Sequence, residues 1–228
     1  MGLYEDAIAA FRSGATGRAE ELSLELMSEA RDGGDLSGEV DGLCMLARVA
    51  LRRGDLEQAS ALAEQAHALA RRAGERRLER MPIHMQAVAV RMRGDFSAAR
   101  LLYEESIEVN MQLGEERMVA VEHRNLAYVE LHDGHADLAR QLFARAAQEA
   151  RALGYDALEP FLLLDAAVVA FVDGDTGRAV QLVTATRAAL LDAGQILDPD
   201  DAAEEERLEA ELSWMGPRRT SGDEAATY

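Results

Sequence analysis

Residues 123–154 read HRNLAYVELHDGHADLARQLFARAAQEARALG, and this stretch decides the fold. It contains two segments in which apolar residues recur at spacings of three and four, the pattern of an amphipathic helix. Each segment ends in a glycine, first Gly134 and then Gly154. Glycine adopts the left-handed backbone that closes a helix at its C-terminus. The stretch therefore predicts two helices joined by a tight corner at Gly134.

The same arrangement returns every forty residues, and five columns of identical residues hold through five successive units. The columns are Gly14, Gly54, Gly94, Gly134 and Gly174; Gly34, Gly74, Gly114, Gly154 and Gly194; Ala7, Ala47, Ala87, Ala127 and Ala167; Ala19, Ala59, Ala99, Ala139 and Ala179; and Leu22, Leu62, Leu102, Leu142 and Leu182. Repetition of this length indicates a solenoid of stacked helix pairs. The alanine columns would let the two helices of a pair approach closely.

The tripeptide Arg-Gly-Asp occurs at residues 53–55 and again at residues 93–95. On an extracellular protein it can be an adhesion signal, but other units fill the same slot with SGA, DGH and DGD. We therefore interpret it as a corner in which glycine ends one helix and aspartate caps the next. Gln58, three residues after Asp55, would complete a capping box there.

The composition excludes several classes of function. The formal net charge is −18, which argues against nucleic acid or an anionic membrane as a partner. The chain has no lysine, so a Schiff-base lysine and a phosphate-loop lysine are both excluded. Cys44 is the single cysteine, and the acidic start of the sequence is unlike a signal peptide. We expect a cytoplasmic protein with no membrane span.

The units resemble tetratricopeptide repeats (TPRs), in which a Leu-small pair is followed by Ala-x3-aromatic. The matching positions are Leu46-Ala47, Leu126-Ala127, Ala99 to Tyr103 and Ala139 to Phe143. The sequence departs from the family in its longer, forty-residue period and in lacking the usual proline after the second helix. The resemblance implies an all-α, right-handed superhelical solenoid of five helix-turn-helix repeats. It also implies that the first helix of each unit lines the concave face.

Residues 115–154 and 173–212 are further similar to the C-terminal repeat region of bacterial regulatory ATPases of the LuxR and antibiotic-regulatory-protein types. In that family the repeats sense or relay a signal. The chain has no glycine-rich phosphate loop and no recognisable DNA-binding helix pair, so the resemblance covers the repeats alone.

The period divides the chain into units and two further segments. Five repeats are expected over 1–194, at 1–34, 35–74, 75–114, 115–154 and 155–194, then a C-terminal capping helix over 195–215 and a flexible tail over 216–228. Leu208, Leu212 and Met215 recur on one face of the capping helix, which would cover the apolar side of the last unit. The acidic run Glu204–Glu206 is expected to face solvent near the start of that helix.

Candidate chemistry is sparse. His132, Asp133 and His135 form the cluster HDGH, which could indicate a metal site, but they lie at an interhelical corner where the rings need not converge. Cys44 has no catalytic partner in the sequence and is interpreted as a buried small hydrophobe. We predict no catalytic residues, no cofactor and no metal.

One stripe on the first helices holds arginine, histidine and tyrosine but no acidic residue, in a chain with 42 acidic residues. It predicts a groove that binds a protein or peptide segment bearing carboxylates, with Tyr128 as an anchor. The groove candidates are Tyr4, Arg12, Arg48, Arg52, His84, Met92, Arg124, Tyr128 and His132. Two other hypotheses stay open: a scaffold that self-associates into a homo-oligomer, and an enzyme built on the same fold.

Overall fold

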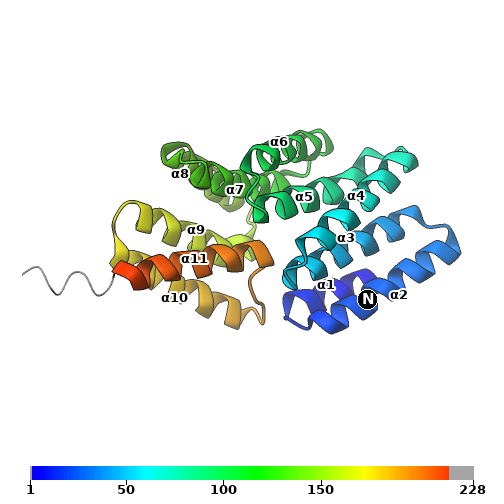
Figure 1. The fold of residues 1–228 in the computed structure, drawn as a ribbon, viewed down its shortest axis with the longest axis horizontal. Helices are drawn as coiled ribbons and strands as arrows, with labels where there is room; N and C mark the ends of the chain where they lie inside the picture. Colours follow the sequence, from blue (N-terminus) through cyan, green and yellow to red (C-terminus); the bar gives the residue numbers. More distant parts are fainter. Residues whose placement is uncertain (1, 216–228) are drawn as a thin grey trace, which may run out of the picture.

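The computed structural model describes residues 2–215, which form helices throughout and wind into an arc (Figure 1). The α-helices are α1 (Leu3–Arg12), α2 (Thr16–Gly33), α3 (Leu36–Arg52), α4 (Leu56–Ala73), α5 (Arg76–Met92), α6 (Phe96–Leu113), α7 (Glu116–His132), α8 (Ala136–Ala152), α9 (Glu159–Val172), α10 (Thr176–Asp192) and α11 (Pro199–Met215), with a 3-10 turn η1 (Asp156–Leu158) before α9. Consecutive helices pack against one another from α1 to α8, and α9 packs on α10. The predicted all-α solenoid of helix pairs is confirmed. Its division into five forty-residue repeats stays a prediction.

The corners between paired helices have the predicted chemistry. All ten column glycines have a positive φ, between +56° and +87°. The side chains of Asp55, Asp95 and Asp175 each accept a hydrogen bond from the backbone N–H three residues later. The predicted capping box at Gln58 is wrong, because the N–H of Asp55 donates to the carbonyl of Ala50 at 3.0 Å rather than to the Gln58 side chain.

Small residues set the spacing of the helices. The alanines of both columns are at most 1% exposed. Larger side chains fill the space beside them, as where Tyr128 and Phe143 meet edge to face with ring centroids 4.9 Å apart. Cys44 is buried in a separate apolar cluster around α3 to α5, so the prediction that it packs as a small hydrophobe is confirmed.

The arc nearly closes on itself. The N–H of Ile196, just before α11, donates to the carbonyl of Arg12 at the end of α1 at 2.9 Å. The Ile196 side chain also lies against Gly14, where an added Cβ would come within 3.1 Å of it. The segment that leads into α11 therefore joins the last helix pair to the first.

Helix α11 packs its apolar side on the last units. Leu208 is 4% exposed and lies in a core with Tyr128 and Val183, and Leu212 packs against the same core. The assignment of 195–215 as a capping helix stays a proposal, and the predicted flexible tail at 216–228 lies outside the described residues. Among the described helices, none combines the length and hydrophobicity needed to cross a bilayer.

The glycine corners give a testable prediction. Gly94 has φ +82° and no atom within 4 Å of an added Cβ, so Gly94→Ala introduces backbone strain without a clash. We expect it to lower the free energy of unfolding by about 1–2 kcal/mol. Gly17 lies in the first turn of α2 and also has no atom within 4 Å of an added Cβ. Gly17→Ala should therefore raise the free energy of unfolding by about 0.5–1 kcal/mol. Chemical denaturation measures both, and equal stability of the two variants would contradict the assignment of the corner.

Candidate binding groove and the helix that fills it

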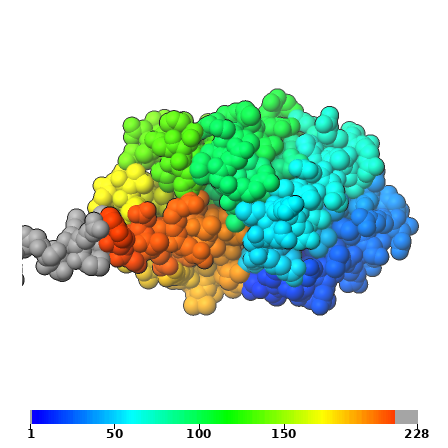
Figure 2. Space-filling view, viewed as in Figure 1, coloured from blue at the N-terminus to red at the C-terminus, as the bar shows by residue number. Residues whose placement is uncertain are grey.

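The concave face of the arc is occupied by the chain's own last helix. Helix α11 contacts α3 at one end and α9 and α10 at the other, and its side chains form ion pairs with α5 and α7 between them. In the space-filling view α11, in orange, lies flush against α3, in cyan (Figure 2). Within this chain α11 therefore covers the face that holds the predicted groove residues Arg124 and His132, and the role of that face as a binding groove stays a prediction.

Arg124 of α7 is the centre of these contacts. Its Nε donates to Asp165 Oδ2 of α9 at 2.8 Å, and its Nη2 donates to Asp201 Oδ1 of α11 at 2.5 Å. All three side chains are at most 4% exposed. A guanidinium held by two carboxylates is a strong arrangement, and removing either partner leaves a buried charge uncompensated.

Tyr128 was expected to be an anchor for a partner, and that interpretation does not fit the structure. The side chain is fully buried, and its hydroxyl donates to Asp165 Oδ1 at 2.8 Å. The guanidinium groups of Arg124 and Arg91 lie 5.3 and 5.1 Å from its ring centroid. Tyr128 therefore lies in the interior, where it contacts Arg91, Arg124 and Asp165 and fixes their orientation.

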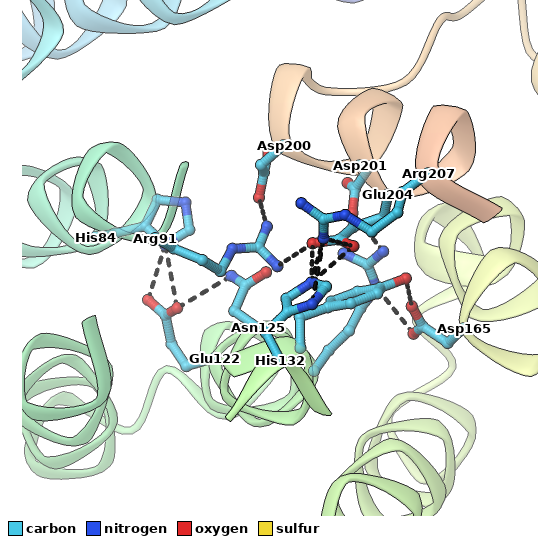
Figure 3. Close-up of polar contacts among 12 residues, drawn as sticks. His84, Arg91, Glu122, Asn125, His132, Asp165, Asp200, Asp201, Glu204 and Arg207 are labelled. Atoms are coloured by element: carbon cyan, nitrogen blue, oxygen red, sulfur yellow. Dashed lines mark hydrogen bonds and ion pairs between the residues drawn. The ribbon is translucent and has the colours of Figure 1, made fainter. Parts of the chain in front are cut away.

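Arg91 of α5 is a groove residue that the sequence stripe missed. It pairs with Asp200 of α11, and its Nη1 lies 3.6 Å from Glu204 Oε1 (Figure 3). Arg91 comes four residues after the alanine of its column, where the other units have large apolar residues: Phe11, Leu51, Leu131 and Phe171. A single arginine in an apolar column was the signal that could have identified it.

The acidic start of α11 faces the groove. Asp200, Asp201 and Glu204 are spaced so that they lie on one side of a helix, and all three are buried. Glu204 accepts from His132 Nε2 and from Arg207, each at 2.9 Å. The expectation that Glu204 faces solvent is wrong, because the groove's cations hold it inside, whereas Glu206 is exposed as expected.

The two neighbouring aspartates of α11 titrate differently. Burial raises the pKa of Asp201 to about 7, since the opposing effect of Arg124 is partly cancelled by the charge of Asp200. Burial also acts on Asp200, but Arg91 and Arg124 outweigh it and lower its pKa. Near neutral pH the groove therefore holds Asp200 as a carboxylate, while Asp201 exchanges a proton.

A second buried network lies beside the first. Glu122 of α7 is fully buried; His84 Nδ1 approaches its Oε1 at 3.0 Å, and Ser106 Oγ donates to the same oxygen at 2.6 Å. Burial would raise the pKa of Glu122, but His84 lowers it overall. His84, predicted as a groove residue, thus lies at the groove with its Nδ1 engaged by Glu122.

The other predicted groove residues fall in three places. Arg12 and Arg48 line a cavity together with His84 and Arg124. The guanidinium of Arg52 lies 3.9 Å from the ring centroid of Phe11 and 3.7 Å from Asp198. Tyr4 is partly buried and packs against the core of the first helix pair, while Met92 and His132 border a small hollow beside α11.

The HDGH corner does not bring its histidines together. His132 stacks on Phe96 and pairs with Glu204, whereas His135 Nδ1 lies 2.8 Å from Glu130 Oε2. Within residues 2–215, no group of three histidine, cysteine, aspartate or glutamate side chains has an arrangement suited to a metal ion.

Comparison with known proteins supports the fold. A tetratricopeptide repeat family model matches residues 40–112. No curated protein matches the chain. Among solved structures, a signal transduction ATPase with a TPR sensor from Pyrococcus horikoshii is similar with a TM-score of 0.63 at 15% identity, over 83% of this chain and 29% of that chain. BtubC from P. vanneervenii has a TM-score of 0.60 at 18% identity, over 94% of both chains. The apo form of RapI has a TM-score of 0.61 at 13% identity, over 96% of this chain and 83% of that chain.

These likenesses are of fold, and they support a TPR-like solenoid. The chain spans less than a third of the Pyrococcus horikoshii ATPase that it matches. The inner helices of the solenoid place arginines where they can hold carboxylates, and the chain places an acidic helix against them. The arrangement is suited to recognising an acidic segment.

The buried arginine gives a testable prediction. Arg124→Met keeps most of the side-chain volume but leaves Asp165 and Asp201 without their shared cation. We expect it to lower the free energy of unfolding by about 3–5 kcal/mol. Arg187, which pairs with Glu205 at an exposed position of the same interface, is the control. Arg187→Met should change stability by less than about 1 kcal/mol, and an equally small effect of Arg124→Met would contradict the assignment.

The raised pKa of Asp201 gives a second prediction. The folded protein binds the proton of the Asp201 carboxyl more tightly than the unfolded chain does, because the unfolded chain has the ordinary pKa of 3.8. The stability that this proton gives the folded state is therefore lost as pH rises toward about 7. From pH 5 to pH 8 the free energy of unfolding should fall by on the order of 1–3 kcal/mol through this group. Asp201→Asn should remove the part of this decrease in stability that is due to Asp201. Asp192→Asn, at an exposed position, is the control and should show the same decrease as the wild type.

Denaturation curves at several pH values measure this difference. Asp41, whose pKa burial raises to about 6, contributes to the fall in all three proteins. Identical pH profiles for the wild type and Asp201→Asn would contradict the prediction.

Proposed function

We propose that this chain is a non-catalytic protein- or peptide-binding module, a regulatory adaptor whose concave groove holds an acidic helical segment of a partner. The observation that most directly supports this is α11. Its carboxylates meet the groove side chains Arg91 of α5 and Arg124 and His132 of α7. The groove thus accommodates, within the chain, a segment of the chemistry expected of the partner.

The partner segment is defined by the pattern that α11 presents. Two adjacent carboxylates followed by a third on the same helical face correspond to Asp200, Asp201 and Glu204. Arginine grips carboxylates with fixed geometry, which favours such a segment over a merely apolar one. A partner would compete with α11 for the same cations.

A regulatory role is consistent with the resemblance of residues 115–154 and 173–212 to repeats of bacterial regulators. One similar structure is described as an ATPase with a TPR sensor. Repeat solenoids of this kind are scaffolds on which binding surfaces are built, and the site decides what is bound. We propose a cytoplasmic protein that acts through protein contacts and not through nucleic acid or membrane.

Self-association is the second candidate. A short segment, residues 193–198, joins α10 to α11. If this segment extended, α11 could occupy the groove of a second copy and produce a swapped dimer.

The proposal is tested with the full-length chain and a labelled peptide of residues 198–215. The variant Asp200→Asn/Asp201→Asn/Glu204→Gln removes the carboxylates through which α11 pairs with the groove. Its α11 should therefore bind the groove more weakly and leave it open to a peptide. We expect the wild-type peptide to bind this variant, to bind the wild-type protein much more weakly, and to lose affinity as salt is raised.

The matched control is the same peptide with the same three amide substitutions, which should bind at least ~10-fold more weakly. Fluorescence anisotropy gives the affinities. Equal binding of both peptides, or binding of neither, would contradict an acidic-helix groove. Analytical ultracentrifugation of the wild type separates the alternatives, because a dimer that the amide variant loses would favour the swapped scaffold.

A further inference from the structure

A cavity of about 140 Å³ remains open beside α11 on the concave face. One wall comes from the solenoid, including Arg12 of α1, Arg48 of α3 and Val121 of α7. The opposite wall is the segment that leads into α11, including Gln195 and Ile196. Because both walls are needed, the cavity exists only when α11 is docked.

The charged groups of the cavity are not all compensated. Asp200 and Asp201 line it, but each is already held by a buried arginine, and Asp198 lies 3.7 Å from Arg52. Arg12 and Arg48 are different. Neither forms an ion pair or a side-chain hydrogen bond with any residue between 2 and 215.

Arg48 has one weak contact, with its guanidinium 5.8 Å from the ring centroid of Phe11. Arg12, which is exposed, and Arg48, which is half-buried, thus have no carboxylate partner within the described part of the chain, because the three aspartates that also line the cavity are paired with other arginines. An anion placed between them would supply the missing countercharge, and a carboxylate matches the fork of a guanidinium.

The rest of the solenoid wall combines the polar residues His84, Arg124 and Asn125 with an apolar and aromatic part. Met118, Leu158, Phe161 and Tyr155 line it next to Val121. Pockets for small molecules combine such a lining with a few polar groups that fix orientation. The size is modest, and the cavity therefore suits a compact group.

We propose that this cavity binds a carboxylate that carries a short apolar group, with the carboxylate at Arg12 and Arg48 and the apolar group against Phe161. The carboxylate can belong to a small organic acid or to the C-terminus of a peptide that ends in an apolar residue. The site borders Arg124, which also holds α11, but does not include Arg91 or His132.

The position of the cavity couples the ligand to α11. A ligand that contacts both walls binds the docked state better than the undocked state, so it stabilises docking, and docking in turn raises its affinity. In a groove that α11 shares with a partner segment, such a ligand would oppose the partner. This consequence rests on the proposed function, whereas binding of the carboxylate does not.

Isothermal titration calorimetry of the full-length protein tests the site. The probes are 4-methylpentanoate and 3-phenylpropanoate, with 4-methylpentanamide as the uncharged control, and two short peptides ending in leucine with a free or an amidated C-terminus. We expect at least one carboxylate form to bind and its amide counterpart to bind at least ~10-fold more weakly. Binding of the small acids identifies a metabolite-type ligand, and binding of the free peptide alone identifies a peptide C-terminus.

Variants locate the binding. Arg48→Gln and Arg12→Gln should each weaken it by ~10-fold or more, whereas Arg72→Gln, at an exposed position on α4, should leave it unchanged. Hydrogen exchange of residues 199–215 should slow when the ligand is present. The proposal is overturned if no carboxylate binds, if the amides bind equally well, or if Arg48→Gln and Arg12→Gln bind as tightly as Arg72→Gln.

Discussion

The structure depends on one requirement: Arg124 is buried in the middle of the solenoid and must have carboxylates on both sides. Asp165 supplies one from the last helix pair, and Asp201 supplies the other from α11. Removing a charge from water costs several kcal/mol unless it is paired and hydrogen-bonded. The path of the chain after α10 therefore has to bring an acid back to α7, and α11 enters the concave face for this reason.

The local rules of the fold are repeated, so the sequence predicted them well. Each corner needs a glycine at positive φ, and each helix pair needs small residues where the helices approach. These constraints involve neighbours along the chain or one helix away, and they recur every forty residues. A single sequence thus contains several independent copies of the same information, which makes the columns readable without any relatives.

The groove was predictable in part, and its occupant was not. The stripe located Arg124 and His132, but nothing in the local pattern showed that their partners would be Asp201 and Glu204, 77 and 72 residues later. The acidic start of α11 fits a solvated helix N-terminus equally well, because the helix dipole favours acids there whether or not they meet an arginine. Only the nearly closed arc, which brings the two ends of the solenoid together, shows that these acids pair with the groove arginines and do not face solvent.

The kind of contact that holds α11 also bears on what the groove can do. Its apolar side buries Leu208 and packs Leu212, while its inner side is held by ion pairs, and those pairs gain little over water once desolvation is counted. Such an interface is specific without being very tight, since a wrong partner would leave buried arginines unpaired. Under the proposed function, a partner helix of the same charge pattern would replace α11, and Asp201, with its pKa raised to about 7, would make that exchange responsive to pH near neutrality. In that proposal the same ion pairs would both select the partner and allow α11 to be replaced.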